Sequence, residues 1–84
     1  MMKRKGATPI AIGKFGAWLL ANMALKDWTY PQCAQAAHCD VVSVCKHVRH
    51  KTRPDFRTVV TYCWAFDMKD DPRQIWKLVE EDWG

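Results

Sequence analysis

The chain has 84 residues, of which 49% are apolar and 26% charged, and its formal net charge is +4. This length suits one domain, and the composition, without repeats or low-complexity tracts, is that of a globular protein. No apolar run approaches the roughly 20 residues of a membrane span. Gly13 and Lys14 interrupt the apolar stretch near the N-terminus, so no secretory signal is predicted. We therefore expect a cytoplasmic protein.

The positive charge is concentrated in the first part of the chain. Residues 1–53 hold nine Lys/Arg against two acidic residues, a net charge of +7, whereas residues 54–84 hold four Lys/Arg against seven acidic residues, a net charge of −3. This asymmetry predicts a polarised surface whose basic part faces a polyanion. The alternative interpretation is a solvated surface of mixed charge.

The spacing of apolar residues predicts five helices and no strand. The first helix is expected from about Pro9 to Leu25, with Thr8 as its N-cap and Pro9 in its first turn. Its apolar residues recur three or four positions apart, at Ile12, Phe15, Leu19 and Met23. The pair Lys26-Asp27 ends this helix.

Two short helices joined by a tight turn are expected next. One runs from about Tyr30 to Ala37 after the N-cap Thr29, and its alanines let another backbone come close. The other runs from about Asp40, its N-cap, to His50. Its inward stripe is Val41, Val44 and Val48, and a second face carries Val42, Cys45, Lys46 and Arg49.

A basic loop, residues 51–53, precedes Pro54 and the last two helices. The fourth helix is expected from about Asp55 to Phe66. Its expected buried face is Phe56, Val59, Val60, Cys63 and Trp64. The fifth starts at Pro72, is capped by Asp71, and carries Ile75, Trp76, Leu78 and Val79. Trp83 is expected beyond its end, folded back onto the core.

The cysteines do not predict a metal site or disulfides. Histidines lie near them, but there is no CxxC, and a spacing of six residues brings no two cysteines together on one helix. Without an export signal the thiols are expected to stay reduced. We interpret Cys33, Cys39 and Cys63 as small core residues, and we expect neither a metal nor a cofactor.

Several segments carry a family resemblance. Trp28–Ala34 matches the opening of a second helix, Val44 stands at the centre of a third, and Arg53–Val59 matches the start of a fourth. From about Phe15 to Val79, this order resembles the phage repressor/Cro (XRE-like) helix-turn-helix DNA-binding family. The resemblance implies an all-α, compact five-helix bundle with a helix-turn-helix over residues 1–84, of which 1–8 form a flexible basic arm. It also implies a bacterial or phage-infected host.

Four histidine and tyrosine positions depart from the family pattern. His38 replaces a turn glycine and is expected at positive φ. His50 replaces the glycine that often ends the third helix, and Tyr30 replaces a glutamine that often supports a phosphate contact. His47 occupies a position that is usually apolar, so the third helix is expected to rotate and use Val48 instead.

The resemblance implies three sets of functional residues. The base-reading face would be Val41, Val42, Cys45, Lys46 and Arg49, with Lys46 or Arg49 donating to guanine and Val42 packing on a thymine methyl. Phosphate contacts would come from Thr29, Gln32, Lys51, Thr52 and Arg53, and from Lys3, Arg4 and Lys5 of the arm. The family dimerises on DNA, here through Ile75, Trp76, Val79 and Trp83.

Each assignment has a structural alternative. In this alternative, Val41 and Val42 are core residues, and Lys46 and Arg49 are solvated without a DNA contact. The tryptophans Trp18, Trp28 and Trp64 would then belong to a dense core. The predicted function is sequence-specific binding of double-stranded DNA as a repressor or Cro-like regulator. The alternative is a helix-turn-helix module that binds proteins, because a reading helix usually displays Gln, Asn, Ser and Arg. An enzyme is not expected, since no nucleophile is paired with a base and no phosphate loop is present.

Overall fold

The computed structural model describes residues 12–84, and in this range it contains five α-helices and no strand. They are α1 (Lys14–Lys26), α2 (Tyr30–Ala36), α3 (Val41–Val48), α4 (Phe56–Ala65) and α5 (Pro72–Trp83). The predicted all-helical class is confirmed for this part of the chain. None of these helices has the length and apolar character needed to cross a membrane.

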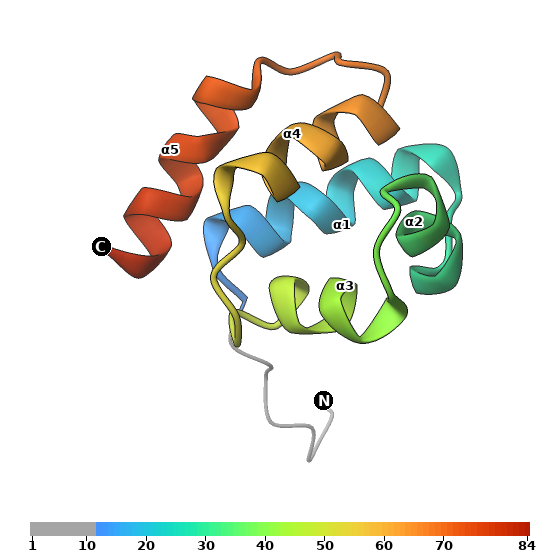
Figure 1. Ribbon diagram of the computed structural model, residues 1–84, viewed down its shortest axis with the longest axis horizontal. Helices are drawn as coiled ribbons and strands as arrows, with labels where there is room; N and C mark the ends of the chain where they lie inside the picture. The colour runs from blue at the N-terminus through green and yellow to red at the C-terminus, as the bar shows by residue number, and fades with distance from the viewer. Residues whose placement is uncertain (1–11) are drawn as a thin grey trace, which may run out of the picture.

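Helix α1 lies at the centre of the arrangement. It packs against both α3 and α5, while α4 packs against α5 and α2. Figure 1 shows α3 along the lower edge of the molecule, α2 beside it on the right, and α5 on the left. The α4–α5 connector lies at the upper edge, opposite α3 (Figure 1).

One continuous apolar core joins all five helices. Its fully buried side chains include Phe15 and Leu19 of α1, Val44 of α3, Tyr62 of α4 and Val79 of α5. As predicted, Cys33 and Cys63 are buried in it, whereas Cys39 is only half-buried. The core extends through Trp18 and Trp28, which are half-buried and pack on the ring of Phe66.

The predicted buried face of α4 is partly wrong. Val59 and Cys63 are buried, but Trp64 is 70% exposed and Phe56 is 43% exposed. The buried row is Val59, Tyr62, Cys63 and Phe66. Residues 56, 60 and 64 follow each other at four-residue spacing along a neighbouring row, which is half-buried at Val60 and exposed at both ends. The expectation that Trp64 belongs to the core is therefore corrected.

Side-chain caps begin four of the helices. Thr29, Asp40 and Asp71 cap α2, α3 and α5 as predicted, and Asp55 caps α4. His38 has a φ of 56° and so confirms the expected positive φ after the second helix. His50 also has a positive φ, of 61°, after the third helix.

The predicted start of the first helix is wrong. Thr8 and Pro9 lie outside the described residues, but residues 12 and 13 are not helical and α1 begins at Lys14. Its N-cap, Gly13, has no side chain to accept a hydrogen bond. The acceptor is the carboxylate of Asp82 in α5, which binds the backbone N–H groups of Lys14 and Phe15 at 2.8 Å each.

Gly13 makes room for this carboxylate. A Cβ at residue 13 would lie 2.4 Å from Oδ2 of Asp82, which is closer than real Cβ contacts. The last turn of α5 therefore supplies the group that caps α1. Helix α5 includes Trp83, which the sequence placed beyond its end. Trp83 is half-buried against the core, so the expectation that it packs there is confirmed.

We predict that Asp82→Ala and Gly13→Ala each lower the free energy of unfolding by about 1–2 kcal/mol, the usual cost of losing a helix N-cap. Urea unfolding followed by circular dichroism measures this. Glu80→Ala, an exposed change on the same helix, is the control and should have little effect. The decrease in the free energy of unfolding of the double variant should be smaller than the sum of the two single decreases, because both substitutions break the same contact. Equal losses for Asp82→Ala and Glu80→Ala would contradict the assignment.

Candidate nucleic-acid interface

The inner face of α3 is fixed in the core. Val44, His47 and Val48 are all buried. His47 Nδ1 and the hydroxyl of Tyr62 are hydrogen-bonded at 2.8 Å, and the imidazole meets Phe15 and Tyr62 edge to face. The helix therefore buries both His47 and Val48, rather than rotating to replace one by the other. Burial lowers the pKa of His47, so its imidazole is neutral near pH 7.

A backbone contact sets the position of the C-terminal end of α3. A Cβ at Gly16 of α1 would lie 2.3 Å from the carbonyl oxygen of Val48. Only glycine lets the two helices approach this closely. With its inner face held in this way, α3 presents the opposite face to solvent.

The outer face of α3 gathers all five predicted base-reading residues. Val42 is 55% exposed, Val41 is 38% exposed, Cys45 is half-buried, and Lys46 and Arg49 are exposed. Together with Lys51 they line one shallow hollow of about 300 Å³. Val41 is thus part of the outer face and not of the inward stripe to which the periodicity assigned it.

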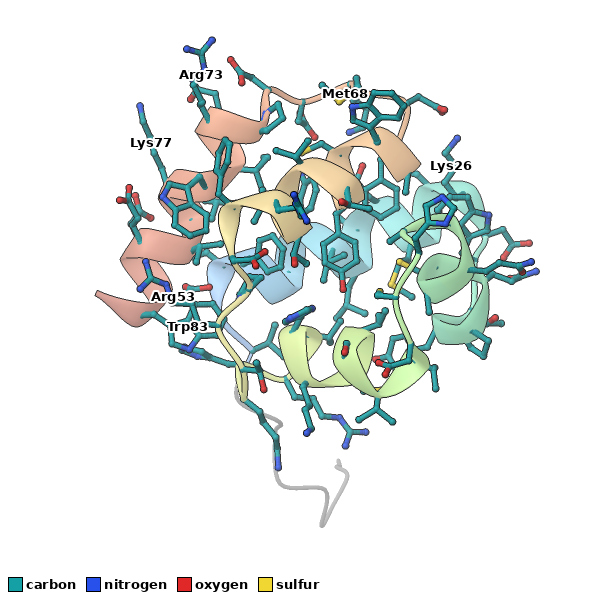
Figure 2. All side chains as sticks on the ribbon, viewed as in Figure 1. Lys26, Arg53, Met68, Arg73, Lys77 and Trp83 are labelled. Carbon is teal, nitrogen blue, oxygen red and sulfur yellow. The ribbon has the colours of Figure 1, made fainter. Side chains whose placement is uncertain are left out.

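The cations of this face are not neutralised by the acidic part of the chain. In residues 12–84 the ion pairs join Lys14 to Glu81, Lys26 to Asp67, Lys69 to Asp70 and Arg73 to Asp71. None of them involves Lys46, Arg49 or Lys51. Figure 2 shows Arg73 and Met68 at the upper edge of the molecule, opposite α3.

Asp40 and Asp55 are the acidic residues that precede and follow the hollow-lining residues in the sequence, and each caps a helix. Asp40 accepts a hydrogen bond from the backbone N–H of Ser43 at 3.0 Å, and Asp55 accepts one from that of Thr58 at 2.8 Å. These hydrogen bonds lower the pKa of both carboxyl groups. Asp40 and Asp55 are therefore ionised and committed to the starts of α3 and α4.

Two of the predicted phosphate-contacting residues form the cap of α2. Gln32 Oε1 accepts the backbone N–H of Thr29 at 2.8 Å, and Thr29 Oγ1 accepts that of Gln32 at 3.4 Å. The Thr29 hydroxyl also donates to Gln32 Oε1 at 3.2 Å. Both residues are exposed, but only the amide NH₂ of Gln32 stays available as a donor.

The predicted phosphate contacts after α3 divide into two groups. Lys51 and Thr52 are exposed, and Lys51 shares the hollow with α3. Arg53 is also exposed, but its guanidinium lies 5.3 Å from the ring centre of Trp76 and so is directed towards α5 (Figure 2). The remaining predicted contacts, Lys3, Arg4 and Lys5, lie outside the described residues.

The predicted dimer surface is wrong in two of its four residues. Ile75 and Val79 are 6% and 0% exposed, because at a spacing of four they form the core-facing stripe of α5. Trp76 is half-buried and packs edge to face on Phe56. Trp83 is half-buried and packs on the ring of His50, whose Nε2 is hydrogen-bonded to the backbone oxygen of Asp82 at 3.1 Å.

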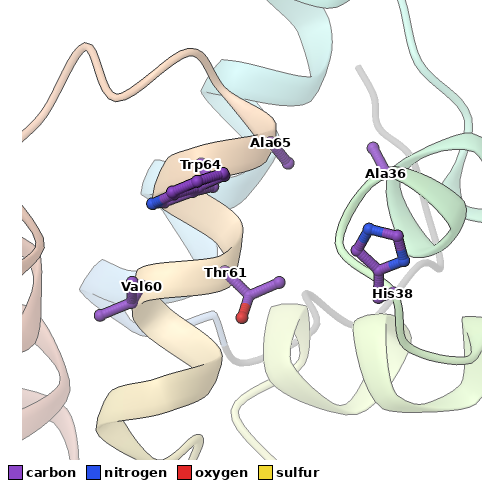
Figure 3. A pocket seen from close by; sticks show the side chains of 6 residues that line it. All are labelled: Ala36, His38, Val60, Thr61, Trp64 and Ala65. Carbon is purple, nitrogen blue, oxygen red and sulfur yellow. The ribbon is translucent and has the colours of Figure 1, made fainter.

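A second hollow, which no sequence pattern predicted, lies between α2 and α4. It has a volume of about 360 Å³, and Figure 3 shows Thr61 and Ala65 of α4 on the side turned towards Ala36 and His38. Its lining is Ala36, His38, Val60, Thr61, Trp64 and Ala65. The hydroxyl of Thr61 donates to the backbone oxygen of Arg57 at 2.9 Å. The hollow is mostly apolar and carries no cluster of charges.

Within residues 12–84 the four cysteines are free thiols, and no three His, Cys, Asp or Glu residues are grouped to hold a metal ion. Burial raises the pKa of Cys33 and Cys63 to about 11, so both thiols are protonated near neutral pH. Comparison of the chain with protein-family models, curated proteins and solved structures finds no match.

We predict that stability falls as the pH drops below about 6.5, the ordinary pKa of histidine. The folded chain keeps His47 neutral, whereas the unfolded chain takes up a proton there, so acid favours unfolding. The capping aspartates have lowered pKa values, so their stabilisation is lost only below about pH 4, outside this window. Urea unfolding at pH 5, 6 and 7 measures the slope.

The variant His47→Gln keeps a neutral hydrogen-bonding side chain at this position. Its free energy of unfolding should fall less between pH 7 and pH 5 than that of the original chain. His38→Gln, an exposed substitution, is the matched control and should retain the slope of the original chain. A slope that is the same in His47→Gln as in the original chain would contradict the assignment to the buried imidazole.

Proposed function

We propose that this protein is a sequence-specific regulator that binds double-stranded DNA, with α3 in the major groove. The observation that carries the proposal is the exposed cationic face of α3: Lys46, Arg49 and Lys51 are exposed and without a carboxylate partner in residues 12–84. A surface of this kind favours a polyanionic partner.

The geometry of α2 and α3 supports a helix-turn-helix interpretation. Four residues separate the end of α2 at Ala36 from the start of α3 at Val41, and the two helices pack on each other. An α-helix such as α3 has a diameter of about 10–12 Å with its side chains, which fits the roughly 12 Å width of the major groove. The resemblance to the phage repressor/Cro family supports the same assignment of roles.

The proposed phosphate contacts surround α3. Lys51 and Thr52 follow it in the chain, and the free amide of Gln32 stands at the start of the helix that packs on it. Arg53 and the basic residues 3–5 would add contacts further out. We expect a dimer on two half-sites about 34 Å apart, with Trp76 and Trp83 as the remaining candidates for its surface.

A protein-binding module is the second candidate function. The exposed fractions of Val42 (55%) and Val41 (38%) favour it, because apolar side chains at the start of an exposed helix also suit a protein partner. The cations beside them would then pair with acidic groups of that partner. Salt-dependent binding to duplex DNA distinguishes the two candidates.

We predict that the chain binds duplex DNA with an affinity that falls linearly with salt on a log–log scale. The double variant Lys46→Ala/Arg49→Ala should relax the sequence preference and weaken binding by about 1–3 kcal/mol, because these side chains are assigned to base edges, and it should also flatten the slope by removing two cations from the interface. Fluorescence anisotropy with labelled duplexes across a salt series measures both effects.

The matched control is Lys69→Ala/Arg73→Ala, which removes the same charge from the α4–α5 connector and the start of α5. Arg73 lies at the edge opposite α3 (Figure 2), and both residues form exposed ion pairs that contribute little to stability. Its salt slope should match that of the original chain. Equal effects of the two double variants, or tight binding to a protein without salt-sensitive DNA affinity, would contradict the proposal.

A further inference from the structure

The hollow on α3 has two chemically different ends. Val41 and Val42 stand at its N-terminal end and are 38% and 55% exposed. Lys46 and Arg49 stand at its C-terminal end and are exposed cations, with Cys45 between the two pairs. A ligand that fills the hollow must therefore offer an apolar group at one end and hydrogen-bond acceptors at the other.

The row along this face has a defined length. Val42, Cys45, Lys46 and Arg49 are spaced at i, i+3, i+4 and i+7, which keeps them on one side of the helix. With a rise of about 1.5 Å per residue, Val42 lies about 6 Å along the axis from Lys46 and about 10.5 Å from Arg49. At about 3.4 Å per base pair, these distances correspond to two to three base-pair steps.

The chemistry of the side chains narrows the choice of bases. In the major groove the thymine C5-methyl is the apolar group, and guanine O6 and N7 are the acceptors that suit lysine and arginine. Residues 41–49 contain no Asn or Gln, the side chains that read adenine, and no carboxylate to accept from cytosine. The exposed valines and cations thus match thymine and guanine.

We infer that α3 selects a half-site in which a thymine and a guanine lie two to three base-pair steps apart, with the thymine methyl against Val42 and the guanine against Lys46 or Arg49. The inference rests on the proposed function, because it specifies the DNA that the same face would bind. The cationic end of the hollow complements the negative charge of the phosphates that line the groove.

The experiment starts from a randomised duplex pool, from which the full 84-residue chain selects its preferred sites. In the enriched duplex, each thymine is then replaced by deoxyuridine, which removes only the methyl group. Each guanine is replaced by 7-deazaguanine, which removes only the N7 acceptor. We expect about fourfold weaker binding for the loss of the contacted methyl and about tenfold weaker binding for the loss of the contacted N7.

Val42→Ala should reduce the sensitivity to deoxyuridine, because it removes part of the apolar surface against the methyl group, while keeping the sensitivity to 7-deazaguanine. Leu25→Ala is the matched control, since Leu25 is a 75% exposed apolar residue on α1. It should keep both sensitivities. Because the base substitutions leave the protein unchanged and Val42 is exposed, a folding defect does not interfere with the test.

The outcomes separate this inference from the proposed function. Salt-sensitive DNA binding without an enriched sequence, or an enriched site that tolerates deoxyuridine at every thymine, overturns the inference and leaves the proposed function standing. Sensitive thymine and guanine positions that are further apart than three steps also overturn it. Absence of binding to any duplex overturns both.

Discussion

The backbone contact between Gly16 of α1 and Val48 of α3 determines where α3 lies. A larger residue at position 16 would place its Cβ 2.3 Å from the Val48 carbonyl oxygen and push the end of α3 outward. Next to this contact, the hydrogen bond between His47 and Tyr62 attaches α3 to α4. Two neighbouring helices thus fix the inner side of α3, and the opposite side is exposed. Any function of the outer face depends on this attachment.

The C-terminal turn of α5 keeps acidic groups away from that outer face. Asp82 caps α1, and Glu81 pairs with Lys14 at 2.7 Å, so both carboxylates are engaged at the start of α1. The backbone oxygen of Asp82 is also hydrogen-bonded to His50, just after α3. These acidic groups of the C-terminal half therefore stabilise contacts within the fold, while Lys46, Arg49 and Lys51 take part in no ion pair within residues 12–84. The charge asymmetry of the sequence becomes an asymmetry of the surface in this way.

Local patterns predicted the five helices and, except for Val41, the outer face of α3. Caps such as Asp40 and the three-to-four spacing of apolar residues act within one or two turns, so the sequence alone displays them. The start of α1 could not be predicted, since its capping group comes from a residue 68 positions away. The sequence also predicted the wrong burial for some residues of α4 and α5. Whether Tyr62 or Trp64 faces the core depends on tertiary packing: the ring of Tyr62 lies 5.9 Å from that of Phe15 in α1, whereas Trp64 is 70% exposed. Ile75, which the sequence assigned to an interface, is 6% exposed on a helix that packs against both α1 and α4.

The central claim is that the outer face of α3 contacts DNA. Chemical-shift mapping on the ¹⁵N-labelled chain, titrated with the duplex that it selects, tests this claim most directly. The account predicts that the largest shift changes fall on Val41–Arg49 and Lys51, with little change on the connector between α4 and α5. Large changes confined to that connector or to the hollow beside Trp64, with residues 41–51 unchanged, would contradict it.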